Sequence, residues 1–183
     1  MAVTPRPTAR IKFRRYRRDD SEAVSAMFSD DQARRFYPDM GDPGRADGWI
    51  AWNLDNYAVD GFGLWVIERR DDASFLGDCG LTYQQVEGKA WLEVGYHLQE
   101  QHRGNGYATE AAAVCITHAF GVLAAPRVCS IVDPDNAASI RVASRLHQSN
   151  RAFTSEQGKP MVLYWSVRPT PSRHAGVEKP PTG

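Results

Sequence analysis

Cysteine is scarce in this chain, and no two cysteines are spaced closely enough to form a CxxC pair. The three cysteines, Cys79, Cys115 and Cys129, each stand alone in apolar surroundings. A disulfide scaffold or a zinc site needs several closely spaced cysteines, so the sequence predicts buried reduced thiols and no metal site. Reduced thiols favour a cytoplasmic location.

Long apolar runs and net charge are also lacking. No stretch of about eighteen apolar residues occurs, and residues 1–9 have no apolar signal-peptide core, so we expect neither a membrane segment nor secretion. The 22 basic residues balance 22 acidic ones, so bulk electrostatics gives no reason to expect a nucleic-acid partner. Locally, six of residues 10–18 are basic. We interpret them as a strand with Ile11 and Phe13 facing the core and solvated charges, in preference to a patch for an acidic partner.

The most informative feature that is present is a glycine-rich segment at residues 103–109, with the sequence RGNGYAT. Glycine has no Cβ, so two glycines one residue apart allow a tight turn with backbone N–H groups pointing inward. The helix predicted to follow adds unpaired N–H groups and the positive end of its dipole. This junction suits an anion such as a pyrophosphate and indicates a nucleotide-type cofactor.

Three kinds of phosphate-binding loop compete for this segment. A Walker loop requires Gly-Lys-Ser/Thr, and no lysine lies nearby. The dinucleotide fingerprint shares the glycine spacing, but residues 99–103 separate the strand from the first glycine, and too little chain follows for a doubly wound sheet. The third kind, Arg/Gln-x-x-Gly-x-Gly/Ala, is matched at every position by residues 103–108.

The third pattern is the acyl-CoA loop of the GNAT-type N-acetyltransferases, and neighbouring segments resemble the same family. Residues 127–132 form an apolar strand that leads to a helix of the form Asn-x-x-Ser-x-Arg-Val, which is similar to the family's second signature. Residues 75–81 and 93–96 resemble strands of the branch that acetylates N-terminal α-amines of ribosomal proteins. The resemblance covers residues 10–168 in consistent order.

The resemblance implies one α+β domain, with a mixed, mostly antiparallel sheet of about six to seven strands and helices on both faces. We expect strands at 10–15, 64–69, 74–84, 90–98, 127–132, 151–154 and 160–167, and helices from Asp19 or Asp20 to about 29, and at 43–57, 106–120 and 136–147. Residues 1–9 are expected to be flexible, residues 10–168 to form the acyltransferase domain, and residues 169–183 to be a disordered tail.

Acetyl-CoA, without a metal, is the co-substrate that the resemblance implies. In the family the pantetheine arm lies against the end of the fourth strand, which here assigns the backbone of Tyr96, His97 and Leu98 to the arm. The loop and helix start would bind the pyrophosphate through Arg103, Gly104, Asn105, Gly106, Tyr107, Ala108 and Thr109. The side chain of Asn136 can bond the pantetheine amides or cap the helix that follows, and its residue type favours capping.

Acetyl transfer from a thioester needs a neutral amine, a donor for the oxyanion and a proton for the departing thiolate. Glu93 is the first candidate for the base, because strand alternation places it on one face with Gly95, which leaves room for an amine. The alternative for Glu93 is an ion pair with an arginine. His97 is a weaker candidate, since its ordinary pKa of about 6.5 suits a base but a histidine at a strand end is more often exposed.

The proton donor for the thiolate has several candidates. Ser139 resembles the serine that some family members place near the thioester sulfur. Many relatives carry a tyrosine acid seven residues after the asparagine, where this chain has Ala143. The proton would therefore come from Ser139, from water or from no group, because a thiolate with a pKa near 8.5 leaves with modest help. His147 stands where the family often has glycine, so a left-handed helix cap would be strained there and we expect the helix to end differently.

The sequence thus predicts direct acetyl transfer to a primary amine, either a peptide or protein α-amine or a small-molecule amine, and leaves a homodimer open. The aromatic residues of the family's substrate-covering region, Tyr37, Trp49, Trp52 and Tyr57, are expected to serve mainly in packing. Two other functions remain open. They are a non-catalytic acyl-CoA-binding module, motivated by the missing tyrosine, and a dinucleotide-dependent oxidoreductase, supported by the glycine spacing and by Asp133 at a strand end.

Overall fold

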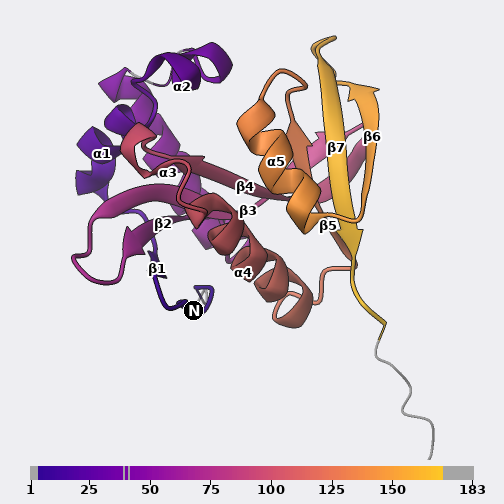
Figure 1. The fold of residues 1–183 in the computed structure, drawn as a ribbon, viewed down its shortest axis with the longest axis horizontal. Coiled ribbons are helices and arrows are strands. Elements are labelled where there is room, and N and C mark those ends of the chain that lie inside the picture. Colours follow the sequence, from indigo (N-terminus) through magenta and orange to yellow (C-terminus); the bar gives the residue numbers. More distant parts are fainter. Residues whose placement is uncertain (1–3, 39, 41, 171–183) are drawn as a thin grey trace, which may run out of the picture.

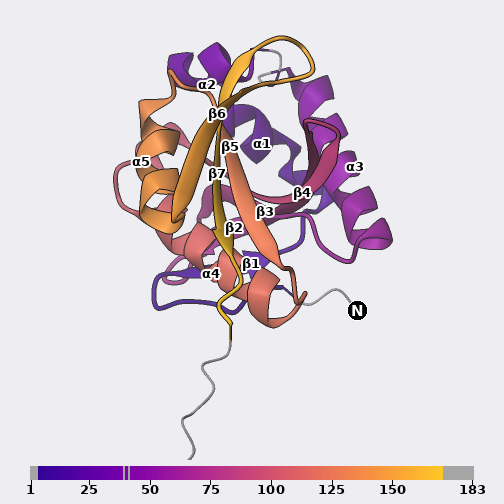
Figure 2. The ribbon, with the colours of Figure 1, turned by 90° about the vertical axis from the view of Figure 1, so that its right-hand side faces the viewer.

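The computed structural model describes residues 4–38, 40 and 42–170 as one sheet with helices on both of its faces (Figures 1 and 2). The strands are β1 (Ile11–Arg14), β2 (Leu64–Arg69), β3 (Phe75–Val86), β4 (Lys89–Leu98), β5 (Arg127–Val132), β6 (Ser149–Thr154) and β7 (Pro160–Val167). The helices are α1 (Ser21–Met27), α2 (Asp31–Phe36), α3 (Pro43–Val59), α4 (Tyr107–Gly121) and α5 (Ala137–Leu146), with short 3-10 helices at Arg18–Asp20 and Glu100–His102.

The sheet has seven strands in the order β1-β2-β3-β4-β5-β7-β6. Short polar turns join β2 to β3 and β3 to β4, so these strands pair antiparallel as a meander. The β5–β7 and β7–β6 pairs are also antiparallel, and only β4 and β5 run parallel among the described strands. The predicted α+β fold with a mixed, mostly antiparallel sheet is therefore confirmed.

Helix α4 packs closely on the sheet because its inward residues are small. Ala111, Ala112, Cys115 and Ala119 are fully buried, and this face lies against β3 and β4. Figure 2 shows α4 and α5 on one side of the sheet and α3 on the other. The three cysteines are free and buried, as predicted.

The two halves of the sheet separate between β4 and β5. One residue pair, Glu93 with Cys129, is in parallel register between β4 and β5. In contrast, β3 pairs with β4 as far as Leu98. Within the described residues, positions 94–98 of β4 therefore have a strand partner on one edge only. Backbone N–H and C=O groups on the open edge need other partners, so this opening is a natural place for an extended ligand.

Two local predictions need correction. Helix α1 begins after Asp20, but neither predicted cap uses its side chain, because the Asp20 carboxylate accepts from the Arg17 N–H and pairs with Arg14 instead. The helix also ends at Met27 rather than near residue 29. Helix α2 was not predicted, since its six residues show no helical apolar period; it begins at an Asp30 side chain that accepts from the Ala33 N–H.

Three of the six basic side chains in residues 10–18 form ion pairs within the chain, and Arg15, Arg17 and Arg18 are exposed. Lys12 and Arg14 pair with Glu68, and Arg10 pairs with Glu110 of α4. Ile11 and Phe13 are buried, as expected for a strand whose apolar side chains face the core and whose charged side chains are solvated. Within the start that was expected to be flexible, Thr8 donates to Glu110, which ties this part to α4. Residues 1–3 and most of the expected tail, 171–183, lie outside the described residues.

Candidate active site

The glycine loop turns as its sequence predicts. Gly104 and Gly106 have φ angles of 79° and 80°, a left-handed conformation that side chains with a Cβ rarely adopt. Helix α4 begins directly after Gly106, so the N–H groups of its first turn have no partner inside the helix. The strand–loop–helix path therefore presents N–H donors and the positive helix end at one place.

The Arg103 side chain pairs with a carboxylate of the chain itself and thereby holds the loop. Its guanidinium forms two hydrogen bonds with the Asp30 carboxylate, at 2.8 and 2.7 Å, and Nε donates to the Leu98 carbonyl at 3.1 Å. Hydrogen bonding from Arg103 is also the main reason why the pKa of Asp30 is lowered. These bonds connect the loop to the start of α2 and to the end of β4.

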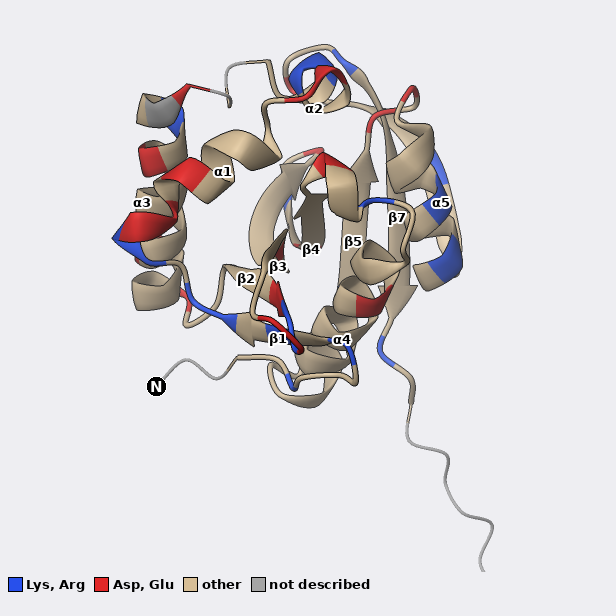
Figure 3. Cartoon of the chain, turned by 60° about the vertical axis from the view of Figure 1, so that its left-hand side comes forward, with Lys and Arg blue, Asp and Glu red and all other residues tan. Residues whose placement is uncertain are grey.

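A cavity of about 400 Å³ lies beside the loop and runs to α5. Tyr96, His97 and Leu98 line it on the β4 side, and Gly104, Gly106, Ala108 and Thr109 line it on the loop side. On α5 the lining includes Arg141 and Arg145, and Figure 3 marks the basic positions along this helix in blue. The lining of this cavity reaches from β4 and the loop to α5 and has basic side chains beside N–H donors, which suits an extended anionic ligand.

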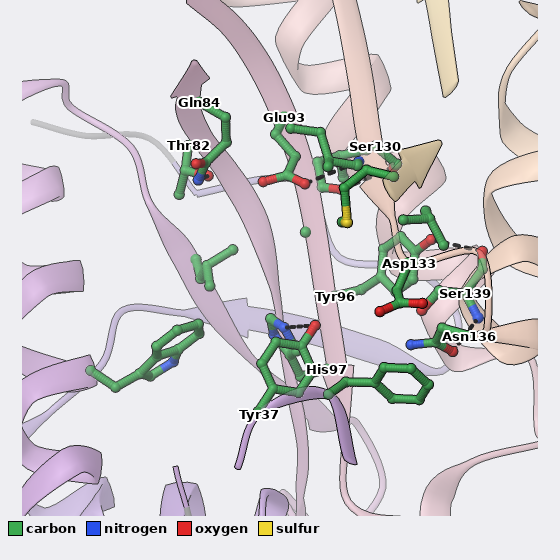
Figure 4. A pocket seen from close by; sticks show the side chains of 18 of the residues that line it. Tyr37, Thr82, Gln84, Glu93, Tyr96, His97, Ser130, Asp133, Asn136 and Ser139 are labelled. Carbon is green, nitrogen blue, oxygen red and sulfur yellow. Dashed lines mark hydrogen bonds between the residues drawn. The ribbon is translucent and has the colours of Figure 1, made fainter. Parts of the chain in front are cut away.

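A second cavity, of about 340 Å³, lies on the other side of the opening between β4 and β5 (Figure 4). Trp49 and Trp52 of α3 form part of its wall, and Trp52 is 39% exposed. Lys159, from the β6–β7 hairpin, pairs with Asp133 at 2.6 Å at its edge. The residues shared by the two cavities are Phe36, Tyr37, Tyr96, His97, Asn136 and Ser139. A donor in one cavity and an acceptor in the other would meet at these six residues.

Glu93 lies in the second cavity, and its partner is a backbone group. Its Oε1 accepts from the Ile131 N–H at 3.1 Å, across the point where β4 and β5 separate. Burial raises the pKa of Glu93 to about 7, although the Ile131 N–H and the nearby His97 act in the opposite direction. Glu93 therefore forms no ion pair with an arginine among the described residues, and that alternative is wrong. A carboxylate with a pKa near neutrality can accept and release protons under ordinary conditions.

A second side chain bridges the same opening from the other strand. Ser130 of β5 donates to the Val94 carbonyl of β4 at 3.1 Å and lies 3.1 Å from Nε2 of His147. His147 follows α5 with an extended backbone, so the expected departure from a left-handed cap is confirmed. Its Nδ1 lies 3.2 Å from the Ser166 hydroxyl of β7, and burial lowers its pKa to about 4. Glu93 and Ser130 thus replace ladder bonds with side-chain bonds.

The expectation that His97 is exposed is wrong. Its side chain is 12% exposed, because the rings of Phe28, Tyr37 and Trp49 surround it with centroids 5.0–5.4 Å away. Its Nδ1 lies 2.7 Å from the carboxylate of Asp78, which is fully buried. Its Nε2 lies 3.1 Å from the Tyr37 hydroxyl (Figure 4).

The start of α5 is ordered by Asn136 and Tyr96. Asn136 Oδ1 accepts from the Ser139 N–H at 3.0 Å, so the predicted cap is confirmed. Among the described residues its Nδ2 group has no protein partner and remains available to donate. Tyr96 donates its hydroxyl to the Ser139 carbonyl at 3.2 Å. Ala143 is buried against Tyr164 and Val132, so the position where a tyrosine was sought belongs to the core.

Sequence reasoning missed Asp78, Tyr37 and the Ser130–His147 pair as parts of the site. Asp78 had a detectable signal, since it is a charged residue in the middle of the apolar strand 75–81. Tyr37 was taken mainly as a packing residue, and only the fold brings its hydroxyl to His97. Tyr57 does belong to the core.

No helix in the described part of the chain is long and apolar enough to cross a membrane. No group of three or more His, Cys, Asp or Glu side chains gathers there in a way that could hold a metal ion. A sheet with a single parallel pair is also not the doubly wound sheet that the dinucleotide interpretation requires.

Comparisons with known proteins agree with this geometry. The family described as an acetyltransferase (GNAT) domain matches residues 10–148. The uncharacterized protein YkkB of Bacillus subtilis (strain 168) is 33% identical over 164 residues, which cover 89% of this chain and 95% of YkkB. An acetyltransferase from Agrobacterium tumefaciens str. C58 has a similar structure, with a TM-score of 0.74 and 24% identity over 91% of this chain and 95% of that one.

The structure of RimL, a ribosomal L7/L12 alpha-N-protein acetyltransferase in complex with coenzyme A, is similar as well. Its TM-score is 0.70 at 17% identity, covering 87% of this chain and 95% of RimL. At these identities the structural likenesses show a shared fold.

Proposed function

Because the chain belongs to the GNAT family of acetyl-CoA-dependent N-acetyltransferases, we propose that it transfers the acetyl group directly to a primary amine that enters the cavity containing Glu93. The observation that carries the proposal is the pair of cavities that meet at the opening between β4 and β5. One cavity suits an extended anion, and the other contains a carboxylate with a raised pKa.

The coenzyme would occupy the cavity beside the glycine loop. Its pyrophosphate would lie on the N–H groups of residues 104–109, with Arg103 holding the loop through Asp30. Its pantetheine arm would pair with the open edge of β4 at Tyr96, His97 and Leu98. The Nδ2 group of Asn136 would donate to an amide of the arm, and Ser139 would lie near the sulfur.

Glu93 would act as the base, directly or through water. A primary amine is mostly protonated at neutral pH and must lose a proton before it attacks the thioester. With a pKa of about 7, Glu93 can take that proton and release it to solvent in each cycle. The pH profile of kcat/KM is expected to rise as pH passes through about 7, because only the ionised form of Glu93 accepts a proton.

The acceptor is proposed to be either a peptide or protein α-amine or a small-molecule amine. The name of RimL, whose fold is shared, supports an α-amine, and the indole walls of Trp49 and Trp52 suit a small amine with an apolar part. A cytoplasmic location, where acetyl-CoA is available, belongs to the same proposal. A homodimer stays a prediction.

Mass spectrometry of reactions with acetyl-CoA and a panel of peptides and small primary amines tests the proposal. We expect one or more acetylated products, and a decrease in kcat of about 100-fold for Glu93→Gln, the typical contribution of a general base. Glu22→Gln, on the exposed face of α1, is the matched control and should keep full activity. The proposal is wrong if the protein binds coenzyme A but acetylates no amine in the panel.

A further inference from the structure

Tyr37 lies at the junction of the two cavities, and its hydroxyl contacts His97, which in turn contacts the Asp78 carboxylate. It follows α2 directly, and both Tyr37 and His97 line both cavities. The Tyr37 hydroxyl is 3.1 Å from His97 Nε2, and His97 Nδ1 is 2.7 Å from Asp78. Figure 4 shows the Tyr37 hydroxyl directed at the His97 ring.

The buried Asp78 carboxylate fixes the orientation of the His97 ring. Its Oδ2 accepts from the Tyr16 hydroxyl at 2.6 Å and from Trp49 Nε1 at 3.0 Å, and its Oδ1 faces His97. An ionised carboxylate can only accept hydrogen bonds, so His97 Nδ1 carries a proton and donates it to Asp78. Nε2 is thereby directed at Tyr37. In this orienting role Asp78 stands behind a histidine, as in other proton-transfer sites.

The departing thiolate needs a proton donor at this junction. The Tyr96 hydroxyl is already used, since it donates to the Ser139 carbonyl. Among the described residues, the Ser139 hydroxyl has no titratable side chain within hydrogen-bond distance that could restore its proton. Tyr37 is in contact with a histidine, the side chain whose ordinary pKa lies nearest to neutrality.

We propose that Tyr37 is the general acid that protonates the departing coenzyme A thiolate, with His97 and Asp78 as the positioning residues that supply and restore its proton. This inference rests on the proposed acetyl transfer. It gives Tyr37, directly after α2, the role of proton donor to the thiolate, for which the sequence had offered Ser139, water or no group.

The proton steps balance. The amine forms the new N–C bond, and collapse of the intermediate breaks the C–S bond, which leaves the electron pair on sulfur. Tyr37 gives its hydroxyl proton to sulfur while the protonated His97 gives its Nε2 proton to the Tyr37 oxygen. The products are a neutral thiol, a neutral tyrosine and a neutral histidine. His97 then regains a proton from solvent, and Glu93 releases to solvent the proton taken from the amine.

The relay also removes the main obstacle to a tyrosine acid in this place. Burial raises the pKa of Tyr37, and the charges of Glu93, Asp78 and Asp133 raise it further. The phenol is therefore protonated at ordinary pH and has a proton to give. A phenolate left in this buried place after the transfer would be high in free energy. Because His97 replaces the proton as it leaves, no free phenolate has to form.

Steady-state kinetics of the full chain with acetyl-CoA and a saturating amine test the inference. For Tyr37→Phe we expect kcat to fall about 100-fold, with the KM of both substrates and the calorimetric Kd of coenzyme A within about twofold of wild type. His97→Gln, which keeps a polar side chain but cannot relay protons, should lose kcat similarly. Tyr83→Phe, at a residue that is 56% exposed on β3, is the matched control.

A second acyl donor separates an acid from a structural residue. The acetyl thioester of 4-nitrothiophenol releases a thiolate that needs no proton, so Tyr37→Phe should turn it over at the wild-type rate. Equal losses with both donors, a wild-type kcat for Tyr37→Phe, or a loss confined to Ser139→Ala would each overturn the inference while leaving acetyl transfer intact. If the wild-type protein acetylates no amine, the proposed function itself fails, and the inference fails with it.

Discussion

At the scale of single residues, Glu93 combines two properties that are usually separate. Its carboxylate satisfies a backbone N–H that the diverging strands leave without a ladder partner, and the same burial raises its pKa to about 7. An ordinary glutamate would already be ionised well below that pH. The folded protein therefore binds a proton at Glu93 more tightly than the unfolded chain does, which makes the residue costly to stability when it is ionised.

Replacing Glu93 with glutamine should therefore stabilise the protein at pH 8 while abolishing most activity. Because the folded pKa is raised, stability from the protonated form is complete below the unfolded pKa of about 4.5 and is lost as pH rises through about 7. We expect Glu93→Gln to gain about 1–3 kcal/mol in free energy of unfolding at pH 8, since one pKa unit corresponds to about 1.4 kcal/mol. The gain should shrink towards pH 5.

Urea unfolding of both proteins at pH 5 and pH 8 measures this difference. Glu22→Gln, which changes an exposed carboxylate in the same way, should show no such pH-dependent gain. If the Glu93→Gln protein is less stable than wild type at pH 8, this expectation is wrong. The hydrogen bond from the Ile131 N–H to the ionised carboxylate would then stabilise the fold by more than burial of the charge destabilises it.

At the scale of elements, the separation of β4 and β5 depends on buried side chains from both strands. Ser130 donates to the Val94 carbonyl and contacts His147, which in turn contacts Ser166 of β7. Ser130→Ala should leave a buried carbonyl and a buried imidazole nitrogen without partners, at a cost of about 1–3 kcal/mol in free energy of unfolding. Ser144→Ala, on the exposed face of α5, should cost far less, as equilibrium unfolding can establish.

His147 gives this region an opposite dependence on pH. Burial lowers its pKa to about 4, so the unfolded chain, with an ordinary pKa near 6.5, binds more protons between these values. Stability from neutral His147 is present above about pH 6.5 and is lost as pH falls towards 4. His147→Gln should therefore flatten the loss of unfolding free energy between pH 6.5 and 4. An unchanged slope in acid urea titrations would contradict this assignment.

Much of the element order could be predicted from the sequence, and the reasons for the exceptions are physical. Alternating apolar strands and the alanine-rich face of α4 are local patterns, so they were recognised. Helix α2 is short and is stabilised by the bidentate contact between Asp30 and Arg103, which are far apart in sequence. The loop residues 103–109 follow from glycine geometry, but the His97–Asp78–Tyr37 cluster comes from three separate elements, and no spacing in the sequence reveals it.

At the scale of the whole molecule, the sheet consists of two antiparallel halves that meet at one parallel pair. Strands β1–β4 form one half and β5–β7 the other, with α4 and α5 in contact across the boundary. Few backbone bonds join the halves, so the boundary should open locally more easily than either half. A ligand that pairs with β4 and contacts α5 would connect both halves when it binds.

Coenzyme A should therefore stabilise the protein globally and protect the open edge of β4. At a ligand concentration of 100 times Kd, binding to the folded state alone adds about 2.7 kcal/mol to the free energy of unfolding. Thermal shift should record this with coenzyme A, and NAD at the same concentration should give no comparable shift. In hydrogen-exchange mass spectrometry, peptides covering residues 94–109 should exchange more slowly with coenzyme A, whereas peptides from β1 and β2 should change little. Equal protection everywhere would mean that the ligand raises overall stability without bridging the boundary, and a shift with NAD alone would point to a different ligand for the glycine loop.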